Sequence, residues 1–216
     1  VSLFLISVPR SGAAAALKDT AVSERFADLA HIVFPEHETF STASGTRLIL
    51  HTADSPFYAT HEQLHLERDG DGIVGFTLVH GYCWERTGPK LDAADLWALC
   101  ELEGGDGAML RERLAGEYIV AHSRPDGRLL VFNDHSSFET VFYAEPGDAV
   151  HVTNRAGLMR AVEPALGRNY RVYAEMCAVG HRMFSESHVD GVKALTMGQW
   201  LEADAGGCRT PWQSPL

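Results

Sequence analysis

Basic residues are scarce in this sequence of 216 residues. Lysine and arginine together number 18 against 29 aspartate and glutamate residues, which gives a formal net charge of -11 at pH 7. No run of five or more basic residues interrupts this acidic character. A negative protein repels both a phosphate backbone and an anionic membrane surface. We therefore expect neither nucleic acid nor a membrane as a partner.

The sequence also lacks a long apolar run. Residues 1–7, VSLFLIS, are apolar, but no positively charged region precedes them and Pro9-Arg10 ends the run. A membrane-spanning helix needs about 20 apolar residues, and a signal peptide starts with a charged region. We interpret residues 1–8 as a buried first strand.

Cysteine is equally sparse. Four cysteines are spread widely along the chain, mostly within apolar runs: Cys83, Cys100, Cys177 and Cys208. Small secreted domains held together by disulfides have a denser and more regular spacing. The pattern predicts free thiols and a cytoplasmic protein.

Many short strands and a few helices are predicted by the rest of the pattern. With 45% apolar residues, the chain can bury one large core. Short apolar or β-branched runs predict strands at 46–51, 63–67, 73–79, 140–143 and 149–153. Helical patterns cover 23–30, 91–114 with a break near Gly104-Gly105, 156–162 and 173–179.

The most informative stretch is residues 110–143. Two apolar runs at 118–121 and 128–132 flank Pro125-Asp126-Gly127, whose glycine can adopt a positive φ. This arrangement predicts a β-hairpin. A polar loop that contains Asp134 follows the hairpin and leads into the next strand.

The order of residues in this stretch resembles the glutaminase-type N-terminal domain of asparagine synthetases. The matching segments are Leu114-Ala115-Gly116-Glu117-Tyr118, Asp126-Gly127-Arg128-Leu129-Leu130, Asn133-Asp134-His135 and Val141-Phe142-Tyr143. Residues 190–202 are similar to the closing segment of that domain, so the resemblance spans about residues 70–202. Asn133 replaces an arginine of the family pattern, Ser137 or its neighbour replaces a glycine, and Thr140 replaces a proline.

The resemblance implies a four-layer αββα sandwich with antiparallel sheets, the N-terminal nucleophile fold. It implies one domain over residues 1–202, followed by a linker at 203–216 toward a synthetase domain. In the family an N-terminal cysteine attacks glutamine with its own α-amine as base. Here Val1 stands at that position, and Ser2 would be a nucleophile only after removal of Val1.

The glutamine pocket of the family also has only partial counterparts. His80-Gly81 stands where the family has the asparagine and glycine of its oxyanion hole. Arg47 is the nearest candidate for the arginine that binds the substrate carboxylate. Asp95 or Asp92 is the candidate for the aspartate that binds the amine, although an acid at a helix start also explains both. The resemblance therefore implies a degenerate pocket of His80, Gly81, Arg47 and Asp95 without glutaminase activity.

Two further sets of residues have expected roles. Asp134 is expected to hold the loop after the hairpin by accepting backbone N–H bonds. Met197, Trp200 and Trp212 are large apolar residues in or near the linker. They either form an interface with a synthetase domain or fold back onto their own core.

The resemblance is closest in type to the relatives that lack the cysteine, the β-lactam synthetases and lasso-peptide cyclases. It therefore implies a degenerate glutaminase-like domain that is the scaffold of an ATP-dependent, amide-forming enzyme. Its partner would be a synthetase domain or subunit, or a second copy of the chain. ATP and magnesium are expected in the synthetase domain, and no cofactor is expected in this chain.

Two other classes of function remain open. A self-sufficient hydrolase would use Ser2, or zinc bound by His61 and His65 of an H-E-x-x-H motif. The motif needs a helix, whereas on a strand His61 and His65 would lie about 13 Å apart, so we expect no metal site. The other class is a binding module whose former glutamine pocket holds another ligand.

Overall fold

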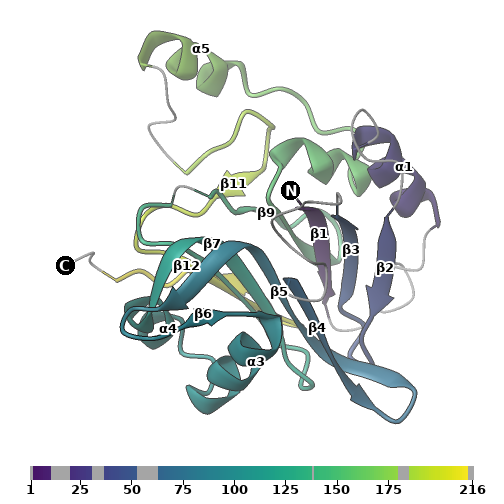
Figure 1. Cartoon of the computed structure of the whole chain (residues 1–216). Coiled ribbons are helices and arrows are strands. Elements are labelled where there is room, and N and C mark those ends of the chain that lie inside the picture. The colour runs from purple at the N-terminus through teal and green to yellow at the C-terminus, as the bar shows by residue number, and fades with distance from the viewer. Residues whose placement is uncertain are drawn as a thin grey trace.

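A computed structural model describes six ranges of the chain: residues 2–10, 20–30, 37–52, 63–137, 139–179 and 185–213. Two antiparallel sheets form the centre of the domain (Figure 1). The first sheet has the strand order β11 (Lys193–Ala194), β9 (Phe142–Ala144), β10 (Ala149–Thr153), β1 (Ser2–Pro9), β3 (Arg47–Thr52) and β2 (Glu38–Ser41).

The second sheet contains the predicted hairpin at its centre. Its order is β13 (Gly207–Arg209), β12 (Trp200–Asp204), β8 (Leu129–Asn133), β7 (Leu114–Ser123), β5 (Gly72–Glu85) and β4 (Leu64–Asp69), and β6 (Lys90–Leu91) also pairs with β5. In the register of the hairpin, Ile119 lies opposite Asn133 and Ser123 lies opposite Leu129.

Alternation along the strands produces the layers. Phe4, Ile6, Leu78, Ile119 and their neighbours form one buried core between the two sheets. Because successive side chains of a strand point to opposite faces, each sheet has a second apolar face to cover. The helix α1 (Thr20–Ala30) and the 3-10 helix η2 (Ala156–Ala161) cover the first sheet. The helices α3 (Ala93–Leu102) and α4 (Gly107–Arg113) cover the second. The result is the predicted four-layer αββα sandwich with antiparallel sheets.

The ends of these helices follow from their capping residues. Asp92 caps α3 by accepting the N–H groups of Ala94 and Asp95, each at 2.9 Å. Gly104 and Gly105 have positive φ values and end the helical stretch, as the sequence predicts. Asp106 then caps α4.

The predicted start of a linker differs from the structure. Residues 203–209 form the end of β12 and the strand β13, where the sequence predicts the start of a linker. Their small and polar composition resembles that of a linker because β12 and β13 meet in a tight turn at the edge of the sheet.

The helix α5 (Tyr170–Val179) lies apart from the sheets in Figure 1.

None of the helices in the described ranges is long and apolar enough to cross a membrane.

Candidate functional site

His80 and Gly81 lie on β5, where this strand leaves the core between the sheets. His80 pairs with Ile119 of β7 and follows Leu78, a member of the central core, by two positions. It therefore lies on the inner face of the second sheet. Only 8% of His80 is exposed.

A carboxylate faces the buried imidazole. The Nε2 atom of His80 lies 3.4 Å from the Oε2 atom of Glu139. The hydrogen bond from His80 lowers the pKa of Glu139 below its ordinary value, although partial burial opposes this, and Arg155 lowers it further. Glu139 is therefore a charged carboxylate at neutral pH, directly beside the imidazole.

The loop after β8 holds Glu139 in this position. The side-chain amide of Asn133 donates to the Glu139 carbonyl oxygen at 2.7 Å. The Asp134 carboxylate accepts the backbone N–H groups of Ser136 at 2.9 Å and of Glu139 at 3.3 Å. Arg111 of α4 donates to the Asp134 carbonyl oxygen at 3.3 Å. These contacts are those of a carboxylate that organises a turn.

Gly81 has a structural requirement of its own. Its φ is +89°, and a Cβ atom at this position would lie 2.1 Å from the carbonyl oxygen of Glu117 on β7. Only glycine can have this conformation while the two strands remain paired. The glycine of the family pattern is therefore present here for a reason that does not depend on catalysis.

The other two predicted pocket residues lie on different faces of the sandwich. Arg47 is buried, and its Nη2 atom donates to the Ser23 hydroxyl of α1 at 2.5 Å. Because Leu48 and Leu50 belong to the central core, Arg47 lies on the outer face of the first sheet. Asp95 lies in α3, outside the second sheet, where it accepts the Asp92 N–H at 3.2 Å. The structure therefore does not bring the four pocket candidates together.

The start of β1 is fixed by polar contacts from β10 and the residue after it. Ser2 pairs with Thr52 on β3, and the Phe4 N–H donates to the Asn154 side chain at 3.2 Å. The Thr153 hydroxyl donates to the Phe4 carbonyl oxygen at 2.6 Å. Val1 lies outside the described residues.

The H-E-x-x-H motif is only partly described, because His61 lies outside the described residues. His65 is on β4, 3.2 Å from Glu67, and its ring packs against Trp97. No group of three or more His, Cys, Asp or Glu residues suited to a metal ion is found in the described ranges.

Glu139, the residue that contacts His80, was not found by analysis of the sequence. It is 59 positions from His80 in the chain, and no local motif marks it. Their contact depends on how the loop between β8 and β9 crosses from one sheet to the other. A single sequence contains no signal for such a pair.

Comparisons with known proteins add evidence about the fold. No family model and no curated protein matches the sequence. One solved structure, described as the allosteric regulatory enzyme of purine biosynthesis, aligns with 98% of this chain at a TM-score of 0.51 and 11% identity. Another, glutamine phosphoribosylpyrophosphate amidotransferase from B. subtilis with ADP and GMP, aligns with 98% of the chain at a TM-score of 0.48 and 12% identity. The chain spans about half the length of each, 49% in both cases.

The first of these two structures supports the fold class. Its alignment covers nearly the whole chain, in agreement with the two antiparallel sheets and few helices described above. An identity of 11% is evidence for the fold alone. The activity must be argued from the residues of the site.

Proposed function

We propose that this chain is a glutaminase-type domain that does not hydrolyse glutamine and is instead a scaffold for an ATP-dependent, amide-forming synthetase domain of the asparagine synthetase class. The observation that carries the first part of this proposal is the Glu139 carboxylate beside His80.

Amide hydrolysis builds negative charge on the carbonyl oxygen, and N–H donors must be free to stabilise it. Loss of one such donor raises the barrier by about 3 kcal/mol. In this chain the imidazole of His80, which the sequence resemblance aligns with the hole, faces an ionised carboxylate at 3.4 Å. An oxyanion bound there would meet a negative charge of its own sign, which opposes the stabilisation that a hole must provide.

The positions of the remaining pocket candidates support the same conclusion. Glutamine needs an arginine for its carboxylate and an acid for its amine near the reacting carbon. Arg47 instead binds Ser23 on the outer face of the first sheet, and Asp95 is part of a helix cap. Neither lies on the face that His80 occupies.

Ammonia release from L-glutamine, measured with a glutamate dehydrogenase-coupled assay, tests the loss of activity. We expect no release above a control without protein. The Glu139→Gln variant should also be inactive, because it removes the repelling charge but restores neither the side-chain amide of the hole nor the binding groups for glutamine. Steady ammonia release by the unmodified protein would overturn the proposal.

The proposed scaffold role rests on an exposed apolar surface near the end of the described chain. Met197 is 49% exposed and Trp212 is 60% exposed. Gly198 connects the two residues. It follows Met197 in the chain, and a Cβ atom at Gly198 would lie 2.9 Å from the Trp212 ring nitrogen. The tail is held in place by Gln213, whose N–H donates to the Gly198 carbonyl oxygen at 3.0 Å. Exposed apolar groups that lie together indicate an interface, whereas single ones are common on any protein surface.

Trp200 does not belong to this surface. It packs in the core beneath α3 and α4, where a Cβ atom on Gly107 would lie 2.6 Å from its ring. Its ring N–H donates to Glu202 at 2.8 Å. Of the three apolar residues expected at an interface, Met197 and Trp212 are therefore the two that a partner could contact.

Binding to a separately expressed synthetase domain, which would hold the ATP and magnesium, tests the scaffold role. We expect Trp212→Glu and Met197→Glu to abolish co-elution in gel filtration without lowering the melting temperature. Leu102→Glu is the matched control, because Leu102 is 76% exposed at the end of α3. Equal loss of binding in the control, or unchanged binding in both variants, would contradict the interface.

A further inference from the structure

A second candidate site lies at the opposite end of the second sheet. A groove of about 460 Å³ lies between the turn of β7 and β8, the turn of β12 and β13, and the residues Gly104-Gly105. Leu129 and Leu130 at the start of β8 line the groove, whereas Asn133 at the end of β8 binds the loop beside His80. The groove is therefore separate from the site described above.

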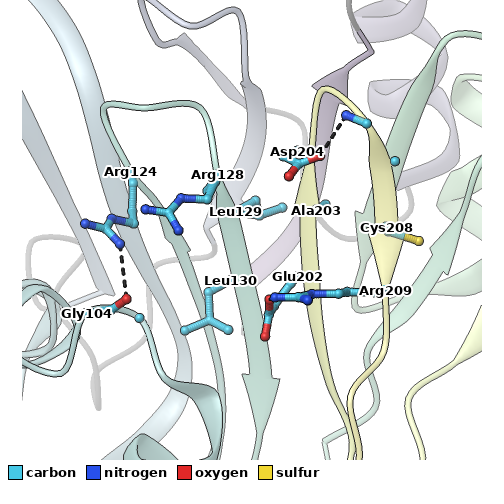
Figure 2. Close-up of a pocket in the computed structure, with 13 residues that line it drawn as sticks. Gly104, Arg124, Arg128, Leu129, Leu130, Glu202, Ala203, Asp204, Cys208 and Arg209 are labelled. Carbon is cyan, nitrogen blue, oxygen red and sulfur yellow. Dashed lines mark hydrogen bonds and ion pairs between the residues drawn. The ribbon is translucent and has the colours of Figure 1, made fainter.

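Figure 2 shows charged side chains on two sides of the groove. Arg124 and Arg128 lie on the hairpin of β7 and β8, and Glu202, Asp204 and Arg209 lie on the hairpin of β12 and β13. Leu130 lies between the two sides, where it forms an apolar floor.

Arg124 is held in place by groups behind the groove. Its Nη1 atom donates to the Gly104 carbonyl oxygen at 3.1 Å, and its Nε atom lies 3.2 Å from the Glu101 carboxylate. Glu101 in turn contacts the buried His122 at 3.1 Å. The guanidinium is therefore fixed before any ligand arrives, and its Nη2 atom makes no hydrogen bond within the described ranges.

The other two arginines are held in the same way. The Arg128 Nε atom donates to Asp126 at 2.7 Å, and the Arg209 Nε atom donates to Glu202 at 2.8 Å. In each case Nη2 contacts the same carboxylate as Nε. The Nη1 atoms of Arg128 and Arg209 make no hydrogen bond in the part of the chain that the structure describes. Side chains that an ion pair already orients lose less conformational entropy when they bind a ligand.

Arg124 and Arg128 are also direct neighbours across the hairpin, since the Arg124 N–H donates to the Arg128 carbonyl oxygen at 2.8 Å. Like charges at such positions repel each other. A carboxylate, with its two oxygen atoms, can bind two guanidinium groups at once. The arginine side of the groove therefore favours an anionic group.

The opposite side offers an acceptor. Asp204 accepts the Gly206 N–H at 2.7 Å through Oδ1, and its Oδ2 atom makes no hydrogen bond within the described ranges. Asp204 is among the carboxylates that raise the pKa of Arg128, after the larger effect of Asp126, so it lies within electrostatic reach of the arginine side. A cation bound at Asp204 would complement this acid.

We propose that this groove binds a free α-amino acid with an apolar side chain. Its carboxylate is bound by Arg124 and Arg128, its ammonium group by Asp204, and its side chain lies on Leu130. This proposal does not depend on the proposed function, because none of these residues takes part in the site at His80.

Isothermal titration of the 216-residue protein with L-leucine and its two half-molecules tests the ligand class. The half-molecules are 4-methylpentanoate, which lacks the amine, and 3-methylbutylamine, which lacks the carboxylate. We expect leucine to bind at least about tenfold more tightly than either, because each charged contact contributes more than the free energy of a tenfold change. Absence of leucine binding, or equal affinity for a half-molecule, would overturn the proposal.

Variants then locate the bound molecule. Arg128→Gln should weaken leucine binding about tenfold or more, the effect of losing a charged hydrogen bond. Asp204→Asn should weaken leucine binding but leave the affinity for 4-methylpentanoate unchanged. Both residues are on exposed turns, so these variants should fold, which the melting temperature verifies. Arg68→Gln is the control, because Arg68 is an exposed arginine of β4 outside the groove. Leucine affinity that is the same in all three variants and the unmodified protein would overturn the site.

Discussion

The two ends of β8 use polar residues in opposite ways. At the last residue of β8, Asn133 binds the loop that follows the strand. In this loop Asp134 accepts backbone N–H groups and Glu139 faces His80. At its first residues, the neighbouring Arg124 and Arg128 are each held by one carboxylate and retain an unused nitrogen. The end at Asn133, here called the loop end, has its polar groups paired within the domain. The end near Arg124 and Arg128, here called the hairpin end, retains hydrogen-bond donors for another molecule.

This difference shows that a polar cluster alone does not define a site. The loop end is where the sequence resembles part of a glutaminase pocket, yet the charged Glu139 there pairs with His80. The hairpin end also belongs to the resemblance, through Asp126-Gly127-Arg128-Leu129-Leu130, yet Arg124 and Arg128 retain unused donors there. Unused donors that are already fixed in place are the better indication of binding.

The largest effect is expected from Gly81→Ala at the loop end. A Cβ atom would lie 2.1 Å from the Glu117 carbonyl oxygen at a φ of +89°. Strain of the backbone and separation of β5 from β7 should together lower the free energy of unfolding by about 4 kcal/mol. Urea denaturation measures this change.

Gly70→Ala is the matched control for Gly81→Ala. Gly70 also has a positive φ, +58°, but no other atom lies within 4 Å of the position that an alanine Cβ would occupy. The free energy of unfolding of Gly70→Ala should fall by about 1 kcal/mol, the cost of the left-handed backbone conformation alone. Equal losses at Gly70 and Gly81 would show that the contact with Glu117 does not matter.

Much of this fold could be predicted from the sequence because its signals are local. The hairpin at Pro125-Asp126-Gly127 and the helix break at Gly104-Gly105 are each determined by residues within a few positions. The hairpin of β12 and β13 was missed, because small polar residues are common in both linkers and tight turns. Pairing of β12 with β8, about 70 residues earlier in the chain, has no local signal.

The hairpin end should be the more acid-sensitive part of the molecule. Burial lowers the pKa of His122 to about 4, although its bond to Glu101 opposes this. Below pH 6.5 the unfolded chain takes up a proton that the folded chain does not, so stability falls as the pH decreases toward 4. At pH 5 the loss should be about 2 kcal/mol.

Denaturation curves between pH 7.5 and 4.5 measure this dependence. His122→Asn should be less stable at pH 7.5, because contacts with Thr77 and Glu101 are lost, but its stability should change less with pH. His151, whose pKa burial also lowers to about 4, should account for the slope that persists. An unchanged slope in His122→Asn would refute this assignment.

Prediction of the site was less complete than prediction of the fold. His80 and Gly81 could be placed because they follow a clear strand pattern. Arg47 and Asp95 could not, since the face on which a residue lies depends on the register of its strand or helix. Neither Glu139 nor the groove arginines could be found, because their positions depend on contacts between distant segments.

Asp134→Ala should have an intermediate effect at the loop end. The change removes the acceptor for two backbone N–H groups, those of Ser136 and Glu139. The free energy of unfolding should fall by about 1.5 kcal/mol. The free energy of unfolding should fall by less in Asp134→Asn, because asparagine keeps one acceptor oxygen. An unchanged melting temperature in Asp134→Ala would contradict the structural role of the carboxylate.

Glu139→Gln should give the smallest effect and the one that most directly compares the two ends. His80 lowers the pKa of Glu139 below its ordinary value of about 4.5. The carboxylate therefore stabilises the folded state at every pH above that ordinary pKa. This contribution is lost as the pH falls through the lowered pKa. Because the Glu139 side chain is 34% exposed, the change at pH 7 should be only about 0.5 kcal/mol. Unfolding curves of both proteins should therefore differ at pH 7 and converge near pH 3. Both proteins should retain the fall in stability that His122 causes below pH 6.5, and absence of that fall in Glu139→Gln would show that the two ends of β8 are not independent.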